Sequence, residues 1–241
     1  MRIISLVPSI TETLIDLAPE WVVGRTKFCI HPAKFVKKIP VVGGTKSFHI
    51  EKVRALKPDL VIANKEENEK EFIEELMKDL KVWVTNIETL EDNYSLIREL
   101  GKITDKQQKA EEICQKTIQI FENHKLKNPL KAAYIIWRKP YMTVGGDNFV
   151  HHLLETIGFD NVFKNRTRYP EISPDELSPA DVILLSTEPY PFSVKHIPEF
   201  KSAQPDKKIR IVDGEAFAWY GSRLSKLENF YRELVAEFNN E

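Results

Sequence analysis

The chain has 241 residues, of which 42% are hydrophobic and 29% charged, as expected for a globular protein of one large domain or two lobes. The 35 basic residues nearly balance the 36 acidic ones, so the formal net charge is only −1. This balance argues against a nucleic-acid-binding protein, which needs a basic surface. No run approaches the roughly 18 apolar residues of a membrane span, so we expect no membrane insertion.

Short strands and helices alternate over the first hundred residues. The sequence predicts strands at 2–6, 21–24, 39–44, 60–63 and 81–85, and helices at 9–17, 50–56, 66–80 and 90–103. Ser9 followed by Glu12 is typical of a helix capping box. The strand at 60–63 is apolar throughout, as in a parallel sheet that is covered on both faces. This alternation indicates a parallel sheet with helices outside it.

A long helix is predicted between the two halves of the chain. Residues 105–125 contain neither glycine nor proline and carry an apolar stripe. No strand accompanies this helix, so we interpret it as a stiff connector. We therefore predict an N-terminal α/β lobe at 1–102, a connecting helix at 103–127 and a C-terminal α/β lobe at 128–241.

The second half repeats the pattern of the first. Strands are predicted at 131–137, 181–186 and 209–212, and helices at 149–157 and 224–238. Gly158 stands where a glycine commonly ends a helix. The segment 42–64, in which a turn, a short helix, a proline and an apolar strand follow one another, is echoed at 172–186. Two similar halves suggest two lobes, and a cleft between lobes is a common place for a small ligand.

Motifs for catalysis are missing. The chain contains no HExxH, GxSxG, GxGxxG or Walker motif. The turn at 43–46 lacks the upstream glycine of a phosphate loop. His31 and His49 could share a metal ion, although polar loop histidines are commoner, and Cys29 and Cys114 match no metal or redox spacing. We therefore expect no enzyme, no catalytic residue, no cofactor of its own and no metal site.

Large aromatic side chains concentrate in the loops that follow predicted strands. These residues are Phe28, Phe48, Trp137, Tyr141, Tyr169, Phe217, Trp219 and Tyr220. Loops after parallel strands lie at the carboxyl edge of the sheet, where α/β proteins bind ligands. Several of these rings could simply anchor their loops, but the set as a whole favours a binding surface for a flat, partly apolar ligand.

Six segments carry a family resemblance over nearly the whole chain. They read RIISLVPSITETL, VVGRTKFCIHP, IEKVRALKPDLVIAN, TVGGDNFVHHLLETIGFDNVF, YPEISPDELSPADVILLS and WYGSRLSKLENF. In this order they resemble the substrate-binding proteins of ABC importers for vitamin B12, haem and ferric siderophores, most of all the vitamin B12-binding proteins. The resemblance implies the class III periplasmic-binding-protein fold, an α/β fold of two lobes, each with a parallel β-sheet flanked by helices, joined by one long helix. It also implies a monomer that delivers its ligand to an ABC permease.

The resemblance also implies roles for individual residues. Glu51 and Glu176, one in each half, match glutamates that dock onto arginines of the permease. Without the resemblance, each carboxylate would simply favour a helix N-terminus. The positions that match ligand-contacting loops are Phe28, Cys29, Thr45, Tyr169, Glu215, Phe217 and Trp219, to which we add Lys46, Trp137 and Tyr141 from the same predicted loops.

The implied ligand is cobalamin, haem or a ferric siderophore. A tryptophan expected near Thr45 is absent, and Trp219 stands where a polar ligand contact is expected. An anionic iron chelate would call for a basic rim, which could come from Arg25, Lys27, Lys46, Arg138, Arg166, Arg168 and Arg223. Cys29 is either a soft ligand to a metal centre or a buried structural thiol.

The sequence is compatible with two compartments and with two other functions. The chain starts with a strand pattern rather than a leader, so we expect a cytoplasmic protein, or a periplasmic one if a leader was trimmed. A cytoplasmic protein of this fold would hold or sense a cofactor. Other possibilities are an enzyme that acts on a cofactor precursor and an interaction module whose cleft is filled by its own side chains.

Overall fold

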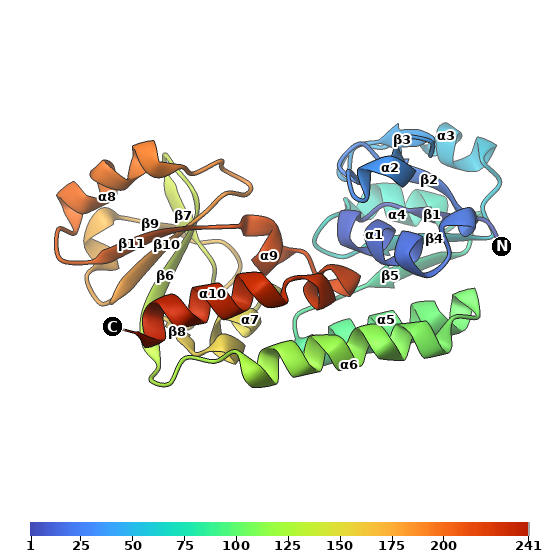
Figure 1. Ribbon diagram of the computed structural model, residues 1–241. Helices are drawn as coiled ribbons and strands as arrows, with labels where there is room; N and C mark the ends of the chain where they lie inside the picture. The colour runs from blue at the N-terminus through green and yellow to red at the C-terminus, as the bar shows by residue number, and fades with distance from the viewer. Residues whose placement is uncertain (241) are drawn as a thin grey trace. The chain divides into compact units, whose positions relative to one another are not determined.

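The structure is a computed structural model that describes residues 1–240 (Figure 1). The chain forms two compact units, each with its own sheet. Unit 1 comprises Met1–Ile87, Glu91–Thr117 and Tyr220–Lys226, and unit 2 comprises Glu88–Leu90, Ile118–Trp219 and the segment from Leu227 onward. Unit 1 is therefore discontinuous, because a short segment near the end of the chain returns to it.

Unit 1 is built on a five-stranded parallel sheet in the order β3-β2-β1-β4-β5. Its strands are β1 (Ile3–Ser5), β2 (Val22–Thr26), β3 (Val41–Gly43), β4 (Leu60–Asn64) and β5 (Val82–Thr85). Its helices include α1 (Pro8–Leu17), α2 (Ala33–Val36), α3 (Ile50–Ala55), α4 (Lys70–Leu76) and α5 (Leu90–Thr104), with 3-10 turns η1 (Pro19–Trp21) and η4 (Gly221–Lys226). Every residue of β4 is buried, as its apolar run predicts.

The first helix differs from the prediction at its start. α1 begins at Pro8, whose fixed φ suits the first helical turn, and Val7 precedes it without a side-chain cap. The predicted capping box of Ser9 and Glu12 is wrong. Glu12 is buried and pairs instead with Arg223 of η4. The carboxylate that the local pattern places in a helix cap therefore binds a residue far away in the sequence.

Gly221 allows the returning segment to pack closely on α1. Its backbone has φ 84°, a conformation that favours glycine. Its N–H donates to Asn93 Oδ1 at 2.6 Å, and the next N–H, of Ser222, donates to Thr13 Oγ1 at 2.9 Å. A β-carbon at Gly221 would overlap the Thr13 hydroxyl, so only glycine fits at this position.

The predicted helix at 66–80 is shorter in the structure, where α4 starts at Lys70 and ends at Leu76. The reason lies at the end of β4. Asn64 Oδ1 accepts hydrogen bonds from the backbone N–H groups of Glu66 and Glu67, at 2.8 and 3.3 Å. This side-chain turn competes with helix formation and delays the start of α4.

Unit 2 has a six-stranded mixed sheet in the order β11-β10-β6-β7-β9, with β8 also paired to β6. Its strands are β6 (Leu130–Trp137), β7 (Tyr141–Thr143), β8 (Phe159–Asn161), β9 (Glu171–Ile172), β10 (Val182–Ser186) and β11 (Lys208–Val212). Its helical segments include α7 (Phe149–Ile157), α8 (Ile197–Ala203), α9 (Gly214–Ala218) and α10 (Glu228–Asn239), with 3-10 turns η2 (Pro174–Leu177) and η3 (Val194–His196). The sheet is mixed because β7 pairs antiparallel with both β6 and β9, which the sequence did not predict.

Helix α7 has the bounds that the sequence predicts. Asn148 caps it by accepting a hydrogen bond from the His151 N–H, and Gly158 ends it with φ 101°. On its inner face Leu153, Leu154 and Ile157 are buried. Each buried side chain of this size contributes about 1.5–3 kcal/mol relative to an exposed one.

The predicted long helix is α6 (Gln107–Asn123), which begins in unit 1 and ends in unit 2. Figure 1 shows α5 and α6 side by side, and Arg98 of α5 pairs with Glu111 of α6 at 2.7 Å. The role of α6 as a stiff connector and the predicted domain boundaries stay predictions. Within residues 1–240, none of the helices is long and apolar enough to cross a membrane.

Candidate ligand-binding site

Buried polar side chains hold the loops at the carboxyl edge of the unit 1 sheet. Asn64 Nδ2 donates to Thr85 Oγ1 at 3.2 Å, which joins the ends of β4 and β5. Asn68 Nδ2 donates to the backbone oxygen of Thr45 at 2.8 Å, which ties the loop after β3 to the loop after β4. All four residues are buried. Buried hydrogen bonds of this kind give the loops one defined shape.

An exposed aromatic ring lies on these loops. Phe28, after β2, is 50% exposed, and Lys27 Nζ lies 5.0 Å from the centroid of its ring. A β-carbon placed at Gly44 would lie 3.6 Å from both side chains, so the loops after β2 and β3 lie close together. Lys46 is exposed on the second loop. Unit 1 therefore presents a ring and cations at its carboxyl edge, and their contact with a ligand stays a prediction.

Cys29 lies under this loop and is fully buried. Thr11 Oγ1 donates a hydrogen bond to its sulfur at 3.0 Å, and the Thr26 hydroxyl lies 3.2 Å away. Burial raises the pKa of the Cys29 thiol, which disfavours the thiolate that binds metals. In this conformation Cys29 is a structural thiol with no surface for a ligand.

In unit 2 the largest exposed ring at the carboxyl edge is that of Trp137. It is 39% exposed at the end of β6 and meets Tyr190 edge-to-face, with 5.7 Å between the ring centroids. Tyr190 follows β10 and packs in turn on Phe192 at 4.7 Å. Tyr190 was not among the predicted site residues. Like the predicted rings, it is an aromatic residue in a loop that follows a predicted strand, so the same criterion would have included it.

Glu199 of α8 organises the polar side of this surface. Arg138 Nε donates to its carboxylate at 2.8 Å, and the Tyr141 hydroxyl donates to the same group. The hydrogen bond from Arg138 lowers the pKa of Glu199. The ring of Tyr141 also stacks on Phe200 at 4.9 Å. Glu199 was not among the predicted residues, because the sequence pattern gave no helix at α8.

The remaining candidates of unit 2 differ in exposure. Tyr169 lies beside Arg168, whose guanidinium carbon is 5.8 Å from the ring centroid. Glu215 and Trp219 are half-buried at the two ends of α9. Phe217 between them is fully buried and packs on Tyr134 at 5.1 Å. Phe217 is thus a core anchor in this conformation rather than a surface for a ligand.

The two candidate docking glutamates are engaged by arginines of their own unit. The side chain of Glu51 is 84% exposed and pairs with Arg54 at 2.9 Å, while Arg54 also binds Glu75 and Asp79. Glu176 accepts the N–H of Ser173 at 2.7 Å, which completes a capping box at η2. It also pairs with a nearby arginine, and the two contacts lower its pKa, the Ser173 hydrogen bond most. Their docking role stays a prediction.

Most of the residues that were expected to form a basic rim donate hydrogen bonds to other groups of the chain. Four of its seven cations donate to partners of their own unit: Arg25 to the Val36 carbonyl oxygen, Arg138 to Glu199, Arg166 to Glu176 and Arg223 to Glu12. Lys27 and Lys46 are exposed. As for metals, no group of three or more His, Cys, Asp and Glu side chains that could hold an ion occurs in the described part of the chain, residues 1–240.

Two α/β units whose sheets carry aromatic rings at their carboxyl edges define a small-molecule-binding protein. The profile of the periplasmic binding protein family matches residues 3–207. The chain belongs to this family. A curated relative, the vitamin B12-binding protein of Salmonella typhi, is 28% identical over 184 residues, which span 73% of this chain and 68% of the relative.

Solved structures share the fold. The periplasmic vitamin B12-binding protein of Vibrio cholerae superposes with a TM-score of 0.82 at 19% identity, covering 100% of this chain and 98% of the other. The periplasmic haem-binding protein RhuT of Roseiflexus sp. RS-1 gives 0.81 at 19% identity, covering 99% and 98%. The predicted α/β class III fold and the assignment to the substrate-binding proteins of ABC importers are confirmed.

Proposed function

We propose that this protein binds a cobalamin-like macrocycle and delivers it to an ABC permease, without chemistry of its own. The names of its relatives, which bind vitamin B12 or haem, support a large, flat metal chelate as the ligand. The exposed rings of Phe28 and Trp137 are suited to the apolar faces of such a macrocycle. In this proposal Thr45, Lys46, Tyr141, Tyr169, Tyr190, Glu215 and Trp219 supply the surrounding contacts.

We favour a corrinoid over an anionic iron chelate because four arginines already donate hydrogen bonds to groups of this chain. An anionic iron chelate needs cations that are available to it, yet Arg25, Arg138, Arg166 and Arg223 each donate to a partner within the chain. Recruiting them would leave buried or half-buried acceptors unsatisfied, at about 1–3 kcal/mol each. A cobalamin-like ring is edged mainly by amides rather than carboxylates and makes no such demand.

Binding measurements with three ligands test the proposal. Titration calorimetry and absorbance spectra would compare cyanocobalamin, haemin and a ferric siderophore. We expect the corrinoid to bind most tightly. Substitutions F28A and W137A should each weaken it about tenfold or more, since large rings dominate such contacts. M77A removes another exposed apolar side chain, at the end of α4, and should leave affinity unchanged.

Two results would reject the proposal. One is the absence of corrinoid binding tighter than roughly 1 mM, about −4 kcal/mol. The other is tighter binding of the siderophore than of the corrinoid. As for the compartment, we propose the periplasm, in keeping with the family, and fractionation of cells that express the native gene would test this.

A further inference from the structure

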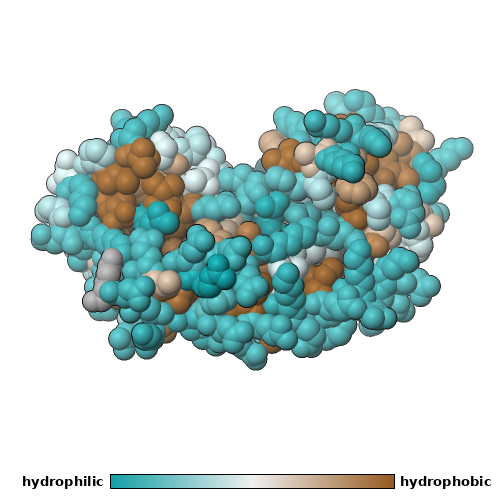
Figure 2. Space-filling view, in the orientation of Figure 1, coloured by the Kyte–Doolittle hydropathy of each residue, from teal (hydrophilic) through white to brown (hydrophobic). Residues whose placement is uncertain are grey.

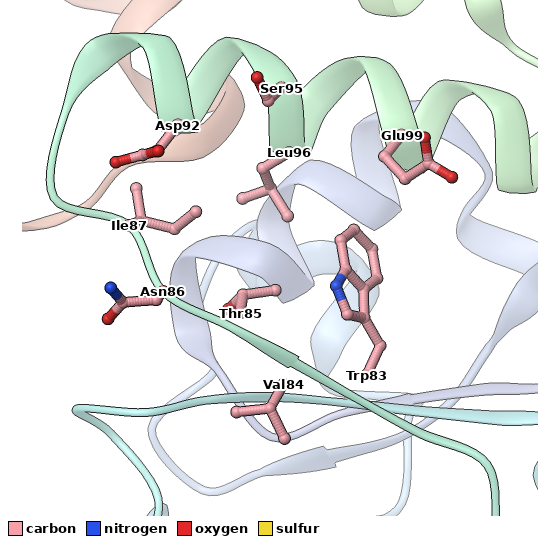
Figure 3. Close-up of a pocket in the computed structure, with 9 residues that line it drawn as sticks. All are labelled: Trp83, Val84, Thr85, Asn86, Ile87, Asp92, Ser95, Leu96 and Glu99. Atoms are coloured by element: carbon pink, nitrogen blue, oxygen red, sulfur yellow. The ribbon is translucent and has the colours of Figure 1, made fainter.

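A cavity of about 350 Å³ lies in unit 1 between β5 and α5 (Figure 3). Apart from Thr85, its lining residues take no part in the loops described above. β5 is the outermost strand of its sheet, so the cavity lies along a sheet edge. Its volume falls in the range of small-molecule sites.

The cavity has a carboxylate at each end and an apolar side chain, that of Leu96, between them. Leu96 and Ile87 of its lining are buried, and Thr85, Asn86 and Ser95 add polar groups. Figure 3 shows Asp92 at one end and Glu99 at the other, with Leu96 between them and the ring of Trp83 below Glu99. An elongated ligand with an apolar centre would match this distribution.

The spacing of the two carboxylates follows from the helix. Asp92 and Glu99 are both on α5 and lie seven residues apart, which places them on one face about 10 Å apart along the axis. Leu96, one turn before Glu99, lies on the same face. The charge pattern is therefore fixed by a rigid element rather than by a mobile loop.

Glu99 already has a cationic partner within the chain. Lys102 Nζ donates to Glu99 Oε2 at 3.1 Å, and its side chain is 66% exposed. An exposed pair of this kind is weak, about 0–1 kcal/mol, so a ligand can displace the lysine. The indole of Trp83 adds attraction for an ammonium group over its face.

We infer that this groove binds a linear alkyl diammonium ion. One ammonium group pairs with Asp92, the other pairs with Glu99 beside the Trp83 ring, and the methylene chain covers Leu96. The two negative charges select this class over anions. Their separation and the apolar Leu96 between them select it over short amines and over bulky rings. The inference is independent of the proposed corrinoid function, because it uses other residues and another ligand.

Calorimetric titration of the full chain at low ionic strength, where exposed charges are least screened, tests the inference. The probes are α,ω-diamines of increasing chain length and monoamines of matched length. Affinity should peak for a diamine whose nitrogens stand about 10 Å apart. The matched monoamine should bind at least about threefold more weakly, because one ion pair is lost.

Variants locate the site. D92N and E99Q should each weaken the best diamine about threefold, and K102Q should strengthen its binding, because a competing ammonium is removed. E91Q removes the same charge next to Asp92 but outside the groove, so it should leave the affinity unchanged. Circular dichroism would verify that all four variants fold.

The inference is overturned by the absence of saturable diamine binding or by affinity that does not depend on chain length. It is equally overturned if the double variant D92N/E99Q binds the diamine as well as the wild type does. Each of these results leaves the corrinoid titrations unaffected.

Discussion

Arg223 donates a hydrogen bond to Glu12 at 2.9 Å, although the two residues are 211 positions apart in the sequence. Lys226 binds the other oxygen of the same carboxylate at 3.0 Å. Glu12 is only 4% exposed, and both cations form ion pairs with its buried carboxylate. The pairs join the first helix of unit 1 to the segment that closes it.

Substitution E12Q should destabilise unit 1. It leaves Arg223, whose side chain is only 13% exposed, without its carboxylate, and breaking a buried pair in this way costs about 3 kcal/mol. Urea denaturation would measure the change, and hydrogen exchange should show lost protection in Gly221–Lys226. E20Q, on an exposed residue just after α1, should change stability by less than about 0.5 kcal/mol. Equal stability of E12Q and wild type would contradict the assigned role.

The pair of Arg98 and Glu111 predicts a dependence on acid pH. The Arg98 guanidinium lowers the pKa of Glu111 from 4.5 to about 2. A carboxylate with a lowered pKa stabilises the fold above its unfolded pKa, and this contribution is lost as the pH falls toward the folded value. The relevant window is therefore pH 4.5 down to about 2.

The test compares urea midpoints of wild type and E111Q across this window. The advantage of wild type should shrink as the pH falls, and its size should stay well under about 1 kcal/mol because both side chains are 44% exposed. E112Q, an exposed position on the same helix, should show no such trend. A constant difference between wild type and E111Q would show that the ion pair adds no stability.

Both cysteines should be unreactive in the folded protein. Cys29 and Cys114 are fully buried, and burial raises the pKa of Cys114 to about 11. A thiol reagent at about pH 8 should therefore modify neither residue until a denaturant is added. The variant C114A, which leaves Cys29 as the one cysteine, would show which of the two thiols reacts. Fast modification of Cys29 would mean that its loop opens and would restore it as a candidate ligand contact.

If the two glutamates dock onto a permease, their substitution should affect transport without affecting ligand binding. E51Q should leave ligand affinity and stability unchanged, because its side chain is 84% exposed, and should abolish stimulation of the permease. E176Q should do the same, because glutamine can still complete the capping box and loses only the ion pair with Arg166. D175N, next to it, is the control. Undiminished transport with E51Q and E176Q would refute the role.

Local sequence signals predicted the elements that local interactions stabilise. Helix α7 has the expected bounds because its cap at Asn148, its apolar spacing and Gly158 all lie within the segment. The short strands β7 and β9 were missed because two or three residues carry no periodicity of their own. Glu12 was assigned to a cap because its real partners lie far away in the sequence. Figure 2 shows a largely hydrophilic surface with separate hydrophobic areas, in line with the composition.

The sequence indicated which loops carry the candidate residues but not which of their side chains are exposed. Trp137 ends one predicted strand and Phe217 follows another, and the sequence offered no reason to expect different exposure for the two rings. In the structure Trp137 is exposed, whereas Phe217 fills the space beside Tyr134. The partners of the arginines could not be predicted from the sequence either. Arg138, for example, binds Glu199, which folding brings to it from a distant helix.

The return of Gly221 and its neighbours to α1 has a consequence for biosynthesis. A nascent chain that has emerged as far as Thr117 holds every other part of unit 1 but lacks the cations that neutralise Glu12. At about 5–20 residues per second, roughly 5–20 s separate that point from the appearance of Tyr220. Translation must therefore nearly finish before the first helix gains its last partners.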